Sequence, residues 1–84
     1  MSLYVKDFHN LYEYLRSIGC TDSQAKIGYL INCGMKNKDI AERLFVSTKT
    51  VNWHINIMYR NMGVKSRMEF LLKIGADYHG KSHY

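Results

Sequence analysis

Hydrophobic residues recur every three or four positions in five successive stretches of the chain. This spacing places apolar side chains on one face of a helix, which can then pack against other helices. The predicted helices cover residues 3–18, 21–33, 37–44, 48–62 and 66–76. No stretch shows a convincing strand pattern. The sequence therefore predicts an all-α fold, with an amphipathic N-terminal helix ahead of a four-helix domain.

Polar residues that can cap helices stand at the predicted helix starts. Thr21 with Gln24, and Ser66 with Glu69, have the spacing of a capping box, in which two side chains satisfy backbone N–H groups at the helix start. The candidate single caps are Asn37 and Ser47. Glycines that can close a helix in the left-handed conformation follow four stretches: Gly19, Gly34, Gly63 and Gly75.

A glycine inside one helix and an apolar connector between two helices predict close packing at these two sites. Gly28 lies within the second helix, where glycine costs about 1 kcal/mol relative to alanine, and the close approach of another helix would explain it. Phe45 and Val46 connect the third and fourth helices, and this connector is too apolar for a free loop. Both sites are expected to lie against neighbouring structure.

The length and composition limit the class of protein. Eighty-four residues allow one domain, and the absence of proline agrees with a mainly helical chain. No apolar run approaches the ~20 residues of a membrane span, and the N-terminus lacks the apolar core of a signal peptide. A cytoplasmic protein without a membrane contact is expected. Residues 1–19 form the extra helix, residues 20–76 the main domain, and residues 77–84 a flexible tail.

Reactive side chains are too scattered to predict catalysis or a metal site. One helix between Cys20 and Cys33 would separate them by about 20 Å, so these thiols are expected to be reduced. There is no CxxC pair, and the only regularly spaced histidines, His79 and His83, lie in the polar tail. No nucleophile stands near a histidine and an orienting carboxylate. Neither an enzyme nor a cofactor or small-molecule ligand is expected.

The net charge of +5 is concentrated in the middle of the chain. Residues 36–67 hold seven lysines and arginines against two acidic residues, whereas the segments on either side are neutral. Charge that serves only solubility would be spread over the surface. A cluster of this kind is typical of a face that binds a polyanion.

A short helix, a tight turn and a longer helix lie within this basic segment, which is the pattern of a helix-turn-helix. The longer helix, 48–62, has an apolar stripe of Val51, Ile55, Met58 and Met62, so its other side is polar. A helix of this kind fits the major groove of DNA. Its polar side carries Lys49, Asn52, Trp53, Asn56 and Arg60.

From Thr21 to Leu72 the chain resembles the DNA-binding domain of the LuxR/FixJ/GerE family. The segment GMKNKDIAERLFVS matches the scaffold helix and turn, TVNWH the start of the recognition helix, and NMGVKSRMEFL the exit into the last helix. The resemblance implies a four-helix domain whose third helix enters the major groove. It also implies a homodimer on an inverted repeat, often formed through the last helix. Because only about 20 residues precede the motif, the chain is expected to be of the stand-alone, GerE-like type.

The resemblance and the chemistry of the side chains together predict two groups of DNA contacts. Base contacts are expected from Lys49, Asn52, Trp53 and Asn56. Phosphate contacts are expected from Lys38, Ser47, Thr48, Thr50, His54, Arg60, Lys65 and Arg67. The chain departs from the family at four positions. The family usually has an acidic residue where Gln24 and Lys26 stand and often a lysine or arginine where Asn52 stands. Trp53 is bulky for a position that faces the groove.

Sequence-specific binding of double-stranded DNA is thus the favoured function, with RNA polymerase or another regulator as a further partner. The alternative is a protein-interaction module of the same fold, which the neutral Asn52 and the bulky Trp53 favour. RNA binding is disfavoured because the major groove of A-form RNA excludes a helix. The N-terminal helix, which contains Tyr4, Tyr12 and Tyr14, is expected either to cover the core or to extend a dimer or partner interface.

Overall fold

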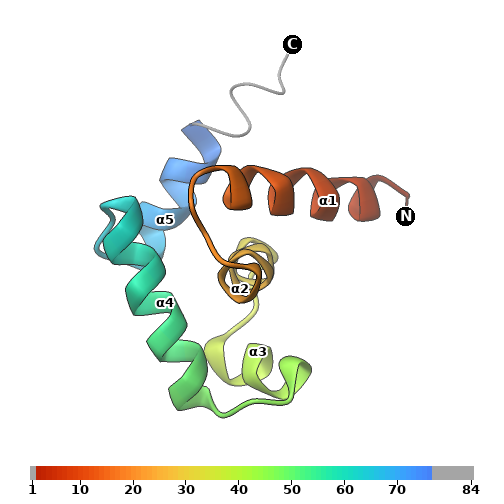
Figure 1. Cartoon of the computed structure of the whole chain (residues 1–84). Helices are drawn as coiled ribbons and strands as arrows, with labels where there is room; N and C mark the ends of the chain where they lie inside the picture. The colour runs from red at the N-terminus through yellow and green to blue at the C-terminus, as the bar shows by residue number, and fades with distance from the viewer. Residues whose placement is uncertain (1, 77–84) are drawn as a thin grey trace.

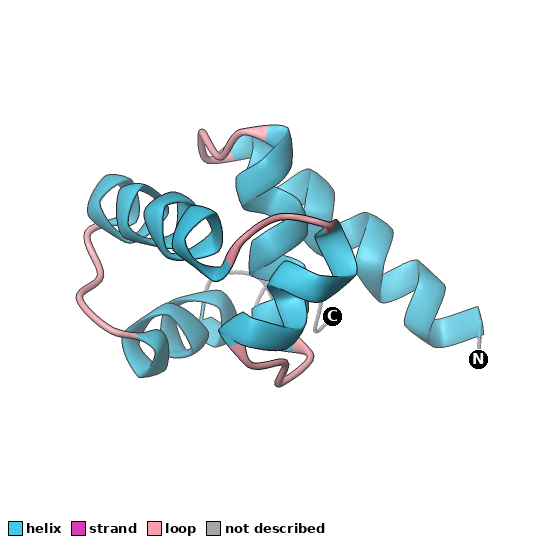
Figure 2. Ribbon diagram, turned by 90° about the horizontal axis from the view of Figure 1, so that it is seen from below, coloured by secondary structure: helices cyan, strands magenta, loops and turns pink. Residues whose placement is uncertain are grey.

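A computed structural model describes the backbone of residues 2–76 and the side chains of residues 9–76. The helices are α1 (Ser2–Ser17), α2 (Asp22–Asn32), α3 (Asn37–Leu44), α4 (Thr48–Met62) and α5 (Arg67–Ile74). The described residues contain only helices and short connections (Figure 2). The predicted all-α fold with an additional N-terminal helix is confirmed. The tail predicted for residues 77–84 lies outside the described residues. None of the helices described is long and apolar enough to span a membrane.

Helix α2 lies at the centre of the molecule (Figure 1). Helix α1 crosses one side of it, α4 packs along another, and α3 and α4 form a pair joined by a short turn. Each helix contributes apolar side chains to one core. The fully buried members with the largest side chains are Phe70, Leu11, Leu15, Ile27, Ile31, Ile40, Met58, Ile74 and Val51.

The core is tightest at Gly28, in the middle of α2. A Cβ atom at this position would lie 2.8 Å from Leu15 Cδ1 and 3.2 Å from Phe70 Cζ. Helices α1 and α5 can therefore approach α2 this closely only because residue 28 has no side chain. The close packing predicted from the sequence at Gly28 is confirmed.

Helix α1 is part of the core. Leu11 and Leu15 are buried, and the Tyr12 hydroxyl donates a 2.5 Å hydrogen bond to Asp22 Oδ1 at the start of α2. This hydrogen bond, together with the ion pair between Lys26 and Asp22, lowers the pKa of the Asp22 carboxyl. The second half of α1 therefore covers the core, which was one of the two roles expected for this helix.

Neither cysteine forms a disulfide, and the two residues lie near opposite ends of α2. Cys20 is buried, and burial raises the pKa of its thiol. Cys33 is exposed at the C-cap. The prediction of reduced cysteines agrees with this arrangement.

Most of the predicted helix ends are found where expected. Thr21 and Gln24 form a complete capping box, and Ser47 and Ser66 each accept a hydrogen bond from a backbone N–H of their own helix. The second capping box is only half formed, because Glu69 Oε1 accepts from the Lys65 N–H instead of the Ser66 N–H. The carboxylate thus stabilises the connection ahead of α5.

Three local predictions are wrong. Asn37 does not cap α3: Lys36 is the N-cap and makes no side-chain bond, while Asn37 is the first helical residue. Gly75 is right-handed, with φ −61°, so it does not close α5 in the left-handed conformation. Phe45 is 94% exposed, so it does not pack as its apolar character suggested. Its backbone conformation directs the side chain away from the core.

Candidate nucleic-acid interface

The turn between α3 and α4 is held by its backbone. Phe45 adopts a left-handed conformation, with φ 59° and ψ 42°, and its N–H donates to the carbonyls of Ala41 and Glu42. The Val46 N–H donates to the Ala41 carbonyl at 3.0 Å. Since a left-handed phenylalanine is uncommon, the contacts on both sides of this residue must hold it there. The turn therefore fixes the direction in which α4 leaves α3.

The start of α4 is organised by hydroxyl groups. Ser47 Oγ accepts a hydrogen bond from the Thr50 N–H at 3.1 Å and lies 3.0 Å from Thr50 Oγ1. Thr48 is exposed beside them. The first turn of α4 thus offers backbone N–H groups and hydroxyls close together, which is an arrangement suited to a phosphate oxygen.

The two sides of α4 differ in chemistry. Val51, Ile55 and Met58 are buried, and Tyr59 stacks on Phe70 with ring centroids 5.5 Å apart. The opposite side is exposed and carries Lys49, Asn52, Trp53, Asn56 and Arg60. We call this side of α4 the outer face. All four side chains predicted to contact bases lie on it, so the helix brings them together.

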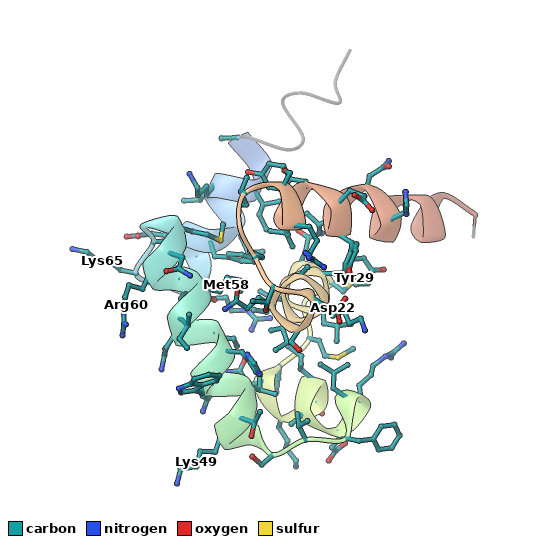
Figure 3. All side chains as sticks on the ribbon, in the orientation of Figure 1. Asp22, Tyr29, Lys49, Met58, Arg60 and Lys65 are labelled. Carbon is teal, nitrogen blue, oxygen red and sulfur yellow. The ribbon has the colours of Figure 1, made fainter. Side chains whose placement is uncertain are left out.

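Basic side chains extend from the outer face. Lys49, Arg60 and Lys65 project from α4 and the segment after it, away from α2 (Figure 3). Lys38 is also exposed, near the start of α3. These positions leave the ammonium and guanidinium groups accessible to a polyanion that lies along α4.

Trp53 and His54 form a pair near the start of α4. Their rings meet edge to face, with centroids 5.0 Å apart and an angle of 69° between the planes. Trp53 is 60% exposed, whereas His54 is half-buried and lines a hollow with Asp22, Lys26 and Thr50. His54 therefore borders the body of the domain, unlike the exposed predicted phosphate contacts Lys38 and Arg60.

Arg67 is engaged within the domain. Its Nη2 donates to the Met35 carbonyl at 2.6 Å and to the Ile31 carbonyl at 3.4 Å, and the side chain is half-buried. These carbonyls lie at and just beyond the end of α2, where helices leave carbonyl groups unpaired. The guanidinium thus ties the start of α5 to the end of α2. The phosphate role predicted for Arg67 remains a prediction, but this nitrogen already has two partners.

Asn37 is a site residue that the sequence pattern did not identify. Its side-chain Nδ2 donates to Asn52 Oδ1 over 2.8 Å, which links α3 to the outer face of α4. With Asn56, Tyr59 and Arg67, these two asparagines line an open hollow beside α4. Burial raises the pKa of the Tyr59 hydroxyl in this hollow. No local sequence signal could have found the pair, because its members are fifteen positions apart.

The fold and this surface define a helix-turn-helix domain, in which α3 is the scaffold helix and α4 the candidate recognition helix. Residues 22–73 match the family model described as bacterial regulatory proteins, luxR family. This match covers more than half of the chain, and the chain belongs to that family. The resemblance seen in the sequence is confirmed.

Curated relatives match a little over half of this chain. A Mycobacterium bovis protein named as an HTH-type transcriptional regulator, Mb0914c, is 39% identical over 51 residues, which are 61% of this chain and 6% of that protein. The HTH-type transcriptional regulator AlkS of Alcanivorax borkumensis is 35% identical over 48 residues, 57% of this chain and 6% of that protein. The chain thus corresponds to a small part of these relatives. No solved structure matches it.

Among the described residues, no group of three histidine, cysteine or acidic side chains could hold a metal ion. The chemistry available on the outer face is hydrogen bonding, stacking and charge. This is the chemistry of recognition, and the family is one of regulatory proteins.

Proposed function

We propose that this protein is a transcription regulator that binds a specific sequence of double-stranded DNA. The observation that carries the proposal is the outer face of α4, which is polar and basic on a helix whose other side is buried. A helix presented in this way fits the major groove, which is about 12 Å wide. The names of the relatives as HTH-type transcriptional regulators support the same function.

The side chains of the outer face divide into two proposed roles. Asn52, Trp53, Asn56 and Lys49 contact base edges. Exposed groups around them contact phosphates and fix the position of α4: Lys38, Ser47, Thr48, Thr50, His54, Arg60 and Lys65. Arg67 contributes to the same region chiefly by holding α5 on α2.

A second copy of the chain is the proposed partner on DNA. Met68 and Leu72 are 69% and 66% exposed and stand four residues apart on α5, so they form an apolar patch on one side of this helix. Pairing of two such patches would place two copies of α4 on an inverted repeat. A regulator of this kind acts with the DNA in the cytoplasm, and RNA polymerase or another regulator is its expected further partner.

The exposed aromatic residues support a second function. Phe45 and Trp53 lie on the turn and the recognition helix, and both are largely exposed. Large exposed aromatic side chains are common at protein interfaces. A protein-interaction module that pairs with another regulator would use this surface without DNA, and the affinity would then depend little on salt.

Selection from a random pool of duplexes, followed by sequencing, tests the proposed function. Purified, folded protein is expected to enrich an inverted repeat. Binding to that site should weaken steeply as salt rises, because each contacted phosphate releases counterion. Arg60→Ala, at an exposed proposed phosphate contact, should reduce this salt dependence. Lys73→Ala, outside the proposed surface, should not. If folded protein enriches no sequence, the proposed DNA function is wrong and the protein-interaction module is favoured.

A further inference from the structure

The hydrogen bond between Asn37 and Asn52 joins the scaffold helix to the recognition helix. Asn37 is the first residue of α3, and Asn52 lies in the second turn of α4. The 2.8 Å bond runs from Asn37 Nδ2 to Asn52 Oδ1. Asn37 is half-buried and Asn52 is exposed, so the bond joins the tip of an exposed side chain on the outer face to the start of α3.

This bond determines how the Asn52 amide is oriented and how much of each end is available. An asparagine side chain has one acceptor atom, Oδ1, with two lone pairs, and one donor group, Nδ2, with two hydrogens. The two-point contact with adenine needs both ends, because Oδ1 accepts from the N6 amino group while Nδ2 donates to N7. In this structure Oδ1 is engaged by Asn37, and Nδ2 has no hydrogen-bond partner among the described residues. The donor end is therefore fully available, whereas Oδ1 is directed at Asn37 and keeps one lone pair.

We propose that Asn37 orients the Asn52 amide so that Asn52 recognises a keto base. In the major groove, guanine and thymine present the carbonyl acceptors O6 and O4, whereas adenine and cytosine present amino donors at the corresponding place. A fixed Nδ2 donor favours guanine or thymine there and leaves adenine and cytosine with two opposed donors. Asn37 is a positioning residue, because it acts only through Asn52. This inference rests on the proposed DNA-binding function.

Entry of α4 into the groove strengthens the hydrogen bond by which Asn37 orients the Asn52 amide. In the free protein this hydrogen bond is exposed, and water competes for both amides. Water is displaced when base edges pack against the outer face, and a hydrogen bond becomes electrostatically stronger in the drier environment. Asn56, on the next turn of α4, provides an internal comparison, since no hydrogen bond engages its amide among the described residues. Asn56 keeps both ends for a base.

Two substitutions at Asn37 test the proposal by changing the orientation of Asn52. Asn37→Asp replaces the donor with a carboxylate, which accepts from Asn52 Nδ2 and turns Oδ1 outward. Asn37→Ala removes the restraint. Asn61→Asp makes the same chemical change on the exposed side of α4 away from the pair, and it controls for the added negative charge. Thermal unfolding verifies that each variant is folded.

The measurement is the relative affinity for duplexes that carry each of the four bases at every position of the selected site. At the position that Asn52 contacts, the unmodified protein is expected to favour guanine or thymine over adenine and cytosine by roughly three- to tenfold, which is the contribution of one hydrogen bond. Asn37→Asp should reverse this preference, Asn37→Ala should reduce it to within about twofold, and Asn61→Asp should retain it. The preferences at all other positions should persist.

The outcomes separate this inference from the proposed function. If a site is selected but the base preferences are the same in both Asn37 variants, the orienting role of Asn37 is wrong and the DNA function stands. If folded protein selects no site, the DNA-binding function and the orienting role of Asn37 are both wrong. Should Asn37→Asp fail to fold, the profile of Asn37→Ala decides alone, because loss of preference at a single position supports the proposal and an unchanged profile overturns it.

Discussion

At the scale of single residues, the packing at Gly28 predicts that its replacement by alanine destabilises the protein. Alanine would gain up to about 1 kcal/mol in helix propensity. The added Cβ, however, would meet Leu15 and Phe70 side chains that are fully buried and have little room to move. Overpacking of a core commonly costs about 1–3 kcal/mol, so a net loss of about 1 kcal/mol is expected. Urea unfolding measures this difference.

Gly75→Ala is the matched control for Gly28→Ala. Gly75 has a right-handed helical backbone and nothing lies within 4 Å of its Cβ position. This substitution should therefore leave the free energy of unfolding unchanged or raise it slightly. If both variants were equally destabilised, the close contact of α1 and α5 with α2 would not explain the glycine at position 28.

Arg67 is predicted to contribute more to the stability of the fold than to the positive charge that binds DNA. Its guanidinium bonds to the carbonyls of Met35 and Ile31 in a half-buried site, and hydrogen bonds of a charged group contribute about 1.5–3 kcal/mol. Arg67→Ala should lower the free energy of unfolding by about this amount. Lys65→Ala, at an exposed neighbouring position, should change stability little but weaken DNA binding at low salt. Equal stability of the two variants would contradict the structural role of Arg67.

These residues show how far sequence reasoning extends. The caps at Thr21 and Ser47 could be predicted because each bonds to an N–H only three residues away. The Arg67 tie and the Asn37–Asn52 bond could not, because they join positions 32 and 15 residues apart and depend on how the helices pack. The packing predicted for Phe45 is wrong for a related reason: hydrophobicity does not reveal a left-handed backbone.

At the scale of elements, helix α1 is predicted to be necessary for the fold. Leu15 is fully buried against α2, and truncation of a buried leucine costs about 2–5 kcal/mol. That is comparable with the whole stability expected of so small a domain. Leu15→Ala should therefore be largely unfolded by circular dichroism at 37 °C. Ile18→Ala, at an exposed position of the same segment, is the control and should remain folded.

The contact between α1 and α2 also predicts a dependence of stability on pH. The Tyr12 hydrogen bond, with Lys26 in addition, holds the pKa of Asp22 below its ordinary 3.8. A lowered pKa means that the carboxylate stabilises the folded state above about pH 3.8 and that this contribution is lost as pH falls through the folded-state pKa. Asp22→Asn lacks it at every pH. The difference in the free energy of unfolding between the unmodified protein and Asp22→Asn should therefore narrow below pH 3.8.

Urea unfolding at a series of pH values measures this difference. Asp39→Asn removes a carboxylate from the equivalent first turn of α3 and accounts for the general effect of helix-terminal charge. The narrowing should be larger for Asp22→Asn than for this control. If the two variants followed the same pH dependence, the link from α1 to Asp22 would not contribute to acid sensitivity.

The elements themselves were largely predictable. Each of the five helices follows an apolar face with members in the core, and the helix-turn-helix spans 37–44 and 48–62 as the sequence predicts. The sequence leaves the role of α1 open, because an amphipathic helix has the same pattern whether it covers a core or binds a partner. Only its packing against Gly28 and the burial of Leu15 distinguish these roles.

At the scale of the whole molecule, the outer face and the apolar patch lie on different elements. The outer face belongs to α4, whereas Met68 and Leu72 belong to α5. Because Arg67 and the stacking of Tyr59 on Phe70 hold α5 in place, the patch has a fixed position relative to α4. A dimer formed through α5 would therefore set the spacing between two half-sites, and it can be disrupted without altering the outer face.

Leu72→Glu is expected to separate dimerisation from folding and from contact with a half-site. Leu72 is 66% exposed, so its replacement should change the free energy of unfolding by no more than about 0.5 kcal/mol. A carboxylate on each side of a two-fold interface would face its own copy, and sedimentation should show a dimer that dissociates at least about tenfold more readily. Affinity for an inverted repeat should fall, while the weak affinity for a single half-site should persist.

Ile18→Glu, which places the same charge on an exposed apolar residue outside α5, should leave dimerisation and the affinity for the inverted repeat unchanged. A dimer that survives Leu72→Glu and Met68→Glu would show that the two copies meet through another surface.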